Sequence, residues 1–185
     1  MIGIKENITF EEGMTTISLL FKEMLNMAEE QFGKSNFGWF FTGIEFKNDY
    51  PHILYYDDKF TIVLSTGCFH IPYLADNFQQ LCYQLSHEVC HSLYLAGSKE
   101  KSNVLNEGIS AYFSIVYDKH RYKNSTYAID CNKKSIYYDA YKLVDKLLSS
   151  DRDAIKKIRK IKPIISTVSI DNLILYSKKN SLREY

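Results

Sequence analysis

The stretch that decides the fold runs from residue 76 to residue 96, and its central five residues read His87-Glu88-Val89-Cys90-His91. In a helix, residues i and i+4 lie one turn apart on the same face, so both imidazoles can reach one metal ion. Glu88 points about 100° round the helix from His87. There it can act on a water molecule beside that ion. The spacing indicates a metal site with a catalytic carboxylate.

The flanking residues predict the helix that this motif requires. Asp76 is a good N-cap with Gln79 as its capping-box partner, and Gly97 can end the helix in a left-handed conformation. Between them an apolar stripe recurs at three- and four-residue spacing: Phe78, Leu81, Cys82, Leu85, Val89 and Leu93. His87 and His91 fall roughly opposite this stripe, so we expect them to face a polar site.

A third ligand candidate, Glu107, opens a second predicted helix over about residues 103–117. Small residues follow Glu107 on the same face, and they let two helices approach closely: Ser110, Ala111 and Ser114. Two histidines with one carboxylate form an established catalytic zinc set. The alternative is an exposed first-turn glutamate favoured by the helix dipole. Apolar residues on another side favour a buried helix, in which a cation is the natural partner of the carboxylate.

This pattern, H-E-x-x-H and then Asn106-Glu107-Gly108-x-Ser110 at a helix start, resembles the gluzincins. These are zinc metallopeptidases that include thermolysin and the zinc aminopeptidases. The resemblance covers about residues 84–113. It implies that His87, His91 and Glu107 bind one Zn²⁺ per chain, that Glu88 is general base and proton shuttle, and that Asn106 supports the ligands. The metzincin pattern does not fit, because Tyr94 and Gly97 stand where it needs glycine and histidine.

The resemblance also implies how substrate is held. The strand before the active helix would bind extended peptide at its edge, lined here by Ser65, Thr66 and Gly67. Gluzincins commonly stabilise the oxyanion with a tyrosine or histidine beyond the third ligand, and the candidates are Tyr137, Tyr138 and His120. His70 is a conceivable extra ligand, although nothing in its spacing ties it to His87.

The rest of the chain predicts an N-terminal helix, then three strands, and further helices towards the C-terminal end. Thr9 caps a predicted helix that runs to Gly33, and strands are expected at 36–47, 53–56 and 60–65, with a hairpin turn at 57–59. Residues 118–134 lack a period and predict a long loop. Helices follow at about 135–149 and 151–161, the first with an apolar stripe of Ile136, Ala140, Leu143, Val144 and Leu147.

These elements predict an α+β, zincin-like fold. An N-terminal helix and a small, mostly antiparallel sheet would pack on the active-site helix, and a helical C-terminal part would complete the cleft. We expect one metallopeptidase-like domain over residues 1–185, with a zincin core at 1–117 and the helical part at 118–185.

Composition narrows the function classes. The chain has 185 residues, 45% of them hydrophobic, and a net charge of +1, so it can bury a core and gives no electrostatic case for nucleic acid or an anionic membrane. It shows no membrane-spanning run and no signal-peptide layout, so a cytoplasmic location is expected. The cysteines lack C-x-x-C pairing and read as free thiols: Cys68, Cys82, Cys90 and Cys131.

The function expected from these features is zinc-dependent hydrolysis of a peptide or protein substrate, with Glu88 as general base. Two alternatives stay open. The chain can be a catalytically inactive, zincin-like metal-binding module that acts in partner binding. It can also be a metal-free interaction domain in which the motif is coincidental.

Overall fold

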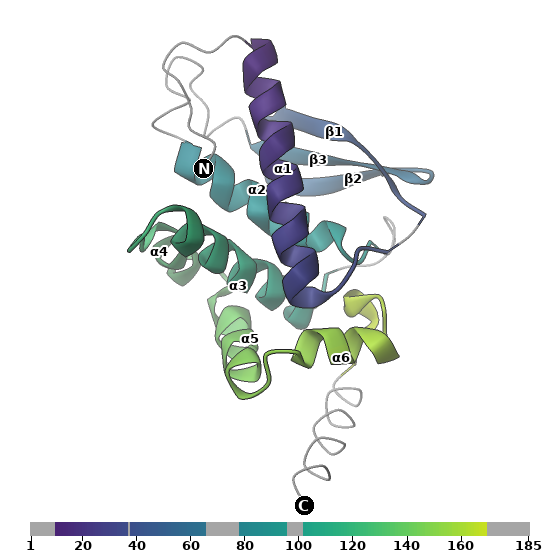
Figure 1. Ribbon diagram of the computed structural model, residues 1–185, viewed down its shortest axis with the longest axis vertical. Coiled ribbons are helices and arrows are strands. Elements are labelled where there is room, and N and C mark those ends of the chain that lie inside the picture. Colours follow the sequence, from purple (N-terminus) through teal and green to yellow (C-terminus); the bar gives the residue numbers. More distant parts are fainter. Residues whose placement is uncertain (1–9, 37, 66–77, 96–101, 170–185) are drawn as a thin grey trace, which may run out of the picture.

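The computed structural model describes residues 10–36, 38–65, 78–95 and 102–169. Within these ranges the chain forms six α-helices, a short 3-10 helix and one three-stranded mixed sheet, so the predicted α+β class is confirmed. In Figure 1 the strands lie above α2 and α3, with α4 beside α3 and with α5 and α6 below it.

Helix α1 spans Phe10–Phe32, as predicted for this region, and buries one face. The residues along this face are buried: Ile17, Leu20, Phe21, Met24, Ala28 and Phe32. Gly33 follows with a φ of +97°, the left-handed conformation that ends a helix and favours glycine. α1 packs on α2, and Phe21 stacks on Phe41 with ring centroids 4.0 Å apart. Thr9, the predicted cap, lies outside the described residues.

The sheet contains β1 (Phe40–Lys47), β2 (His52–Tyr56) and β3 (Lys59–Ser65) in the order β1-β3-β2. The predicted turn between β2 and β3 is confirmed, with Asp57 in a left-handed conformation. The expectation of a mostly antiparallel sheet is wrong, because β1 pairs parallel with β3 and only β2 pairs antiparallel. Alternating apolar residues predict that a strand exists, but not which neighbour it pairs with.

Helices α2 (Phe78–Ser92) and α3 (Val104–Arg121) pack against each other at the centre of the molecule. The stripe predicted for α2 is buried throughout: Phe78, Leu81, Cys82, Leu85, Val89 and Leu93. The expected burial of α3 is also confirmed, since Ile109 and Phe113 are fully enclosed. The predicted ends of α2, Asp76 and Gly97, lie outside the described residues.

The C-terminal part differs from the prediction in two places. Residues 118–134 are not a loop, because α3 continues to Arg121 and a further helix, α4, spans Tyr127–Lys133. Asp118 accepts a hydrogen bond from the backbone of Ala128, and Asn132 donates to the carbonyl of Ala128. These tertiary and side-chain contacts, rather than an apolar period, support α4.

Helix α5 spans Tyr138–Ser150 and buries Ala140, Val144 and Leu148, so Ala140 and Val144 of the predicted stripe are confirmed. Ile136 and Leu143 of the predicted stripe are exposed, at 88% and 62%. The buried face packs on α3. There Gly108 permits a close approach, since a Cβ at that position would lie 2.4 Å from the carbonyl oxygen of Ala140.

Helix α6 (Ala154–Ile161) and the 3-10 helix η3 (Ile165–Thr167) close the described chain. The guanidinium of Arg159 in α6 donates hydrogen bonds to the backbone carbonyls of Phe32, Gly33, Lys34 and Leu93. The same guanidinium lies 5.4 Å from the ring centroid of Tyr94. One side chain therefore joins the C-terminal part to the ends of α1 and α2.

Three cysteines, Cys82, Cys90 and Cys131, are free thiols as predicted, and Cys68 lies outside the described residues. Across the described part of the chain, no helix combines the length and the apolar character that a membrane crossing demands.

Candidate metal centre

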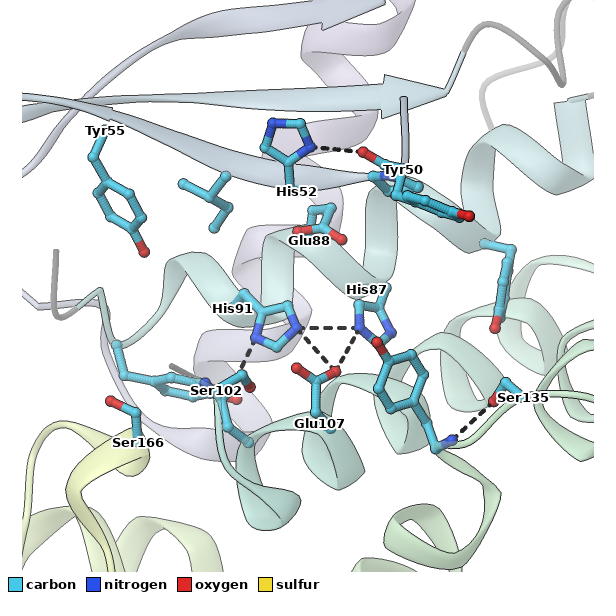
Figure 2. Close-up of a pocket in the computed structure, with 16 residues that line it drawn as sticks. Tyr50, His52, Tyr55, His87, Glu88, His91, Ser102, Glu107, Ser135 and Ser166 are labelled. Carbon is cyan, nitrogen blue, oxygen red and sulfur yellow. Dashed lines mark hydrogen bonds and ion pairs between the residues drawn. The ribbon is translucent and has the colours of Figure 1, made fainter. Parts of the chain in front are cut away.

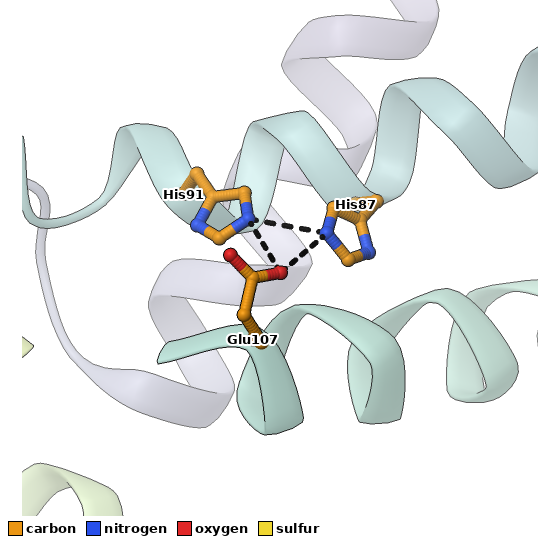
Figure 3. Close-up of side chains that lie close together, drawn as sticks. All are labelled: His87, His91 and Glu107. Atoms are coloured by element: carbon orange, nitrogen blue, oxygen red, sulfur yellow. Dashed lines mark hydrogen bonds and ion pairs between the residues drawn. The ribbon is translucent and has the colours of Figure 1, made fainter. Parts of the chain in front are cut away.

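Three side chains from α2 and α3 converge on one point (Figure 3). The Nε2 atoms of His87 and His91 lie 3.1 Å apart. Oε2 of Glu107 lies 3.4 Å from the Nε2 of His87 and 3.6 Å from that of His91. The three side chains are only 13–17% exposed. Glu107 is thus not the exposed first-turn residue of the alternative interpretation.

The separations fit a tetrahedral metal ion. Zinc binds imidazole nitrogen and carboxylate oxygen at about 2.0–2.2 Å, so two such ligands in a tetrahedron lie about 3.4 Å from each other. The three observed separations lie within about 0.3 Å of that value. The donor set, two imidazole nitrogens and one carboxylate oxygen, can hold a metal ion, and among the described residues it is the one cluster of this kind.

The position of Glu107 depends on the cap of α3. Asn103 accepts a hydrogen bond from the backbone N–H of Asn106 through its side-chain oxygen. Its amide nitrogen donates to backbone carbonyls of the segment around η3: Ile165, Ser166 and Val168. The first turn of α3 is therefore fixed from both sides, and Glu107 with it.

Asn106, expected to support the ligands, contacts one of them directly. Its Oδ1 lies 3.0 Å from Nδ1 of His91 and accepts the proton of that nitrogen. This contact orients the ring so that Nε2 is the atom that faces the cluster. Asn106 is itself 7% exposed, so the contact is shielded from solvent.

Burial and neighbouring charges set the ionisation of the cluster. Burial opposes a charge on Glu107, but hydrogen bonds from His87 and His91 outweigh it and hold the pKa of this carboxyl well below its usual range. Burial likewise opposes a charge on His91, yet its contacts with Glu107 raise the pKa of the imidazole. Glu88 is 4% exposed, and burial raises the pKa of its carboxyl. Two carboxylates in one site therefore differ in proton affinity.

A cleft of about 490 Å³ opens over the cluster. Glu88 lies between the histidines and β2, whose side chains form one wall (Figure 2). The residues that contribute to that wall are Tyr50, Pro51, His52, Ile53 and Tyr55. The opposite wall comes from the first turn of α3, the α4–α5 connection and η3.

The strand that borders the cleft is β2, not the strand that directly precedes α2 in the sequence. β3 ends at Ser65 and is the central strand, paired on both sides. Ser65, expected at a substrate-binding edge, pairs with Lys47 of β1 and is not among the residues that line the cleft. The Ser65 N–H donates to the side chain of Gln84 in α2 instead. Thr66 and Gly67, named with it, lie outside the described residues, as does His70.

Only one of the three oxyanion candidates lies in the cleft. The ring of Tyr137 is 5.8 Å from that of His87, centroid to centroid. Tyr138 stacks on Tyr141 and lies under the Lys142 ammonium, on the outer side of α5. His120 is exposed thirteen residues after Glu107, about 20 Å along the same helix. Tyr138 and His120 are thus excluded by position.

The prediction omitted several residues of the cleft. Tyr83 precedes His87 by four residues, so helical spacing could have placed it on the face of the two histidines. No sequence pattern could have placed the residues of β2 in the cleft, because the order of the strands in the sheet determines which strand lies beside α2.

A comparison of the chain with protein-family models, with curated proteins and with solved structures gave no match.

Proposed function

We propose that this chain is a zinc-dependent peptidase of zincin-like fold, with the metal held by His87, His91 and Glu107. The observation that carries the proposal is the convergence of three ligand atoms within 4.8 Å of one another, from two packed helices, with Glu88 beside them. A bound metal would supply a Lewis acid that acidifies water and polarises a carbonyl. The expected stoichiometry is one zinc ion per chain.

Glu88 supplies the acid–base chemistry. A carboxylate whose pKa is raised by burial is a stronger base than an exposed one, and its protonated form is still acidic enough to protonate a leaving amine. Glu88 therefore first accepts the proton of the attacking water. It then transfers that proton to the nitrogen of the cleaved bond.

The position of β2 at the edge of the sheet supports a polypeptide substrate. Among the described strands β2 pairs with β3 alone, and its residues line the cleft above Glu88. An extended peptide can add to such an edge through backbone hydrogen bonds. A peptide bound in this way would bring a backbone amide, rather than a side chain, within reach of the cluster.

Tyr137 is the proposed donor to the oxygen of the scissile carbonyl. Burial, together with the negative charges of Glu107 and Glu88, raises the pKa of its hydroxyl, which therefore stays protonated at neutral pH. Loss of one such donor typically lowers kcat by about 10²–10³. We expect that loss in Tyr137→Phe with little change in metal content.

The decisive experiment measures metal content and hydrolysis of an unfolded protein substrate together, in protein purified without a chelator or a histidine tag. Wild type and Glu88→Gln should each hold one zinc, and Glu107→Ala should lose it. Hydrolysis should fall by about 10²–10⁴ in Glu88→Gln. His120→Ala is the matched control, since it removes an imidazole from α3 outside the cleft and should keep both properties.

Each other outcome contradicts a defined part of the proposal. Zinc in the wild type with no hydrolysis of any peptide contradicts the enzymatic function and favours the metal-binding module. Full turnover in Glu88→Gln contradicts the role of Glu88. Absence of tight zinc from every variant contradicts the site itself.

A further inference from the structure

Helix α6 carries most of a strongly basic stretch. Five of the seven residues from 156 to 162 are lysine or arginine, whereas the whole chain has a net charge of only +1. Residues at i, i+3 and i+4 share one face of a helix, so Lys156, Arg159 and Lys160 lie on the same side of α6. This side faces the end of α1, which contacts α6 (Figure 1). Positive charge is therefore concentrated where these two helices meet.

A hollow of about 650 Å³ lies at this place, within the range of volumes typical of small-molecule sites. Four cationic side chains line it: Lys34 from the chain just after α1, and Lys156, Arg159 and Lys160 from α6. No carboxylate is among the described residues that line the hollow. The hollow therefore favours an anion over a neutral or cationic ligand.

Arg159 is a buried cation at this hollow, with 9% of its surface exposed. The partners of its guanidinium are neutral: backbone carbonyls and, at 3.4 Å, the side-chain oxygen of Asn36. Buried arginines are rarely left without a carboxylate, yet Arg159 forms no ion pair with a described residue. Burial lowers the pKa of the guanidinium, because it removes the charged form from water. An anion in the hollow would supply the counter-charge.

The three lysines can still donate to such an anion. Lys34 pairs with Glu29 at 2.6 Å, and its side chain is 80% exposed. Lys156 pairs with Asp153 at 3.3 Å. Lys160 is exposed and forms no ion pair with a described residue. Because an ammonium has three N–H donors, a lysine with one carboxylate partner keeps donors for a second acceptor. Several ammonium groups around one hollow suit the multiple oxygens of a phosphate group.

The lining also has an apolar part, to which Trp39, Leu95, Pro163 and Ile164 contribute. Trp39 is half-buried, and its ring is held by an edge contact with Tyr55, with centroids 5.2 Å apart. A tryptophan ring fixed in this way offers a surface for a planar ring. An inorganic anion alone would leave that surface unused.

We propose that this hollow binds a small phosphorylated molecule that carries a planar ring, the chemistry of a mononucleotide. The phosphate would be held by Lys34, Lys156 and Lys160 beside Arg159, and the ring would pack against Trp39. No described residue lines both this hollow and the cleft over the metal centre. The site is thus a second one, and it does not rest on the proposed peptidase function.

The test uses the full chain and the fluorescence of Trp39, the only tryptophan of the sequence. The protein is titrated with AMP, with inorganic phosphate and with adenosine, under excitation at wavelengths that tyrosine does not absorb, and calorimetry measures the same affinities. We expect AMP to change the fluorescence and to bind about tenfold or more tightly than either of its parts. A repeat with excess chelator excludes binding of phosphate to a metal ion and should give the same affinity.

Three outcomes overturn the proposal. Adenosine that binds as tightly as AMP contradicts the role of the cationic side chains. Phosphate that binds as tightly as AMP contradicts the role of Trp39. Absence of AMP binding, or calorimetric binding that leaves the fluorescence unchanged, contradicts the site itself.

Lys156 and Lys160 supply the selective variants, since neither belongs to the core or to the cleft. Lys160→Gln should weaken AMP binding about tenfold, and Lys156→Gln with Lys160→Gln about a hundredfold, with adenosine binding unchanged. Lys146→Gln, an exposed change on α5 outside the hollow, is the matched control and should keep the wild-type affinity. Wild-type AMP affinity in the double variant overturns the proposed site, because the ligand then binds elsewhere.

Discussion

His91 donates the proton of its Nδ1 to the side-chain oxygen of Asn106 across 3.0 Å. This contact fixes the orientation of the imidazole, whose Nε2 faces Glu107 and His87. A residue one position before Glu107 on α3 thus orients His91 on α2, so the two helices depend on each other for the geometry of the cluster.

The first prediction concerns that contact. Asn106→Ala should weaken zinc affinity by about 10–100-fold, because the imidazole loses the acceptor that fixes its orientation. Asn106→Asp keeps an acceptor of the same shape and should bind zinc at least as tightly as the wild type. Competition with a chromophoric chelator measures both affinities. Wild-type affinity in Asn106→Ala would show that the helix alone orients His91.

The second prediction concerns pH in metal-free protein. Since the folded pKa of Glu107 is lowered, its stabilising contribution is present above its unfolded pKa of about 4.3 and is lost as the pH falls. Since the folded pKa of His91 is raised, its contribution is complete below about pH 6.5 and is lost as the pH rises through the folded value. The pair should stabilise the fold most between those limits.

Urea unfolding with excess chelator, repeated over this pH range, measures the effect. The free energy of unfolding should be about 1.5–3 kcal/mol lower in Glu107→Gln than in the wild type near pH 5.5, with a smaller difference towards both limits. Glu30→Gln, an exposed change on α1, should show no such maximum. A difference that is constant with pH would contradict the proposed pairing.

The third prediction concerns the contact between α3 and α5. In Gly108→Ala the new methyl group would lie 2.4 Å from the Ala140 carbonyl oxygen and 2.8 Å from Cγ2 of Val144, so the two helices must separate. Overpacking of this kind costs about 1–3 kcal/mol and opposes the gain of about 1 kcal/mol in helix propensity. Denaturant unfolding should show a net loss of stability.

The exposed residue Lys119 on the same helix provides the control. Lys119→Ala changes helix propensity without meeting α5 and should stay within about 0.5 kcal/mol of the wild type. A more stable Gly108→Ala would mean that the helices can move apart at little cost.

The fourth prediction concerns Arg159. Replacing it by Met removes the donors of four backbone carbonyls, and each acceptor that stays buried without a partner costs about 1–3 kcal/mol. We expect a loss of about 3 kcal/mol or more in the free energy of unfolding. Lys160→Met, its exposed neighbour in α6, should have little effect. Similar stability of the two variants would contradict the structural role of Arg159.

Local patterns predicted the elements that carry the cluster. The stripe of α2, the apolar faces of α1 and α3, and the turn at Asp57 each depend on residues within a few positions of one another. Spacing on a helix also placed the two histidines on one face. The approach of Glu107 followed from the small residues of α3.

Features that depend on distant partners could not be predicted in this way. The pairing of β1 with β3, and hence the place of β2 beside the cleft, is a choice among partners that alternation does not encode. The helix α4 is stabilised by the hydrogen bond from the Ala128 N–H to Asp118 of α3. Gly108 lets Ala140 of α5 pack directly on α3, and Leu143 then lies on the exposed side of α5. Among the oxyanion candidates, the same packing brings Tyr137 into the cleft and leaves Tyr138 outside.

The hydrogen bonds of Arg159 also determine when, during translation, the fold can be completed. The guanidinium holds the carbonyl of Gly33, 126 positions earlier in the chain. A nascent chain that has released α1, the sheet and both ligand helices from the ribosome still lacks this residue and the wall around Ser166. The complete cleft can therefore form only after Arg159 and Ser166 have been synthesised. Any activity that needs the complete cleft is delayed until the C-terminal helices have emerged from the ribosome.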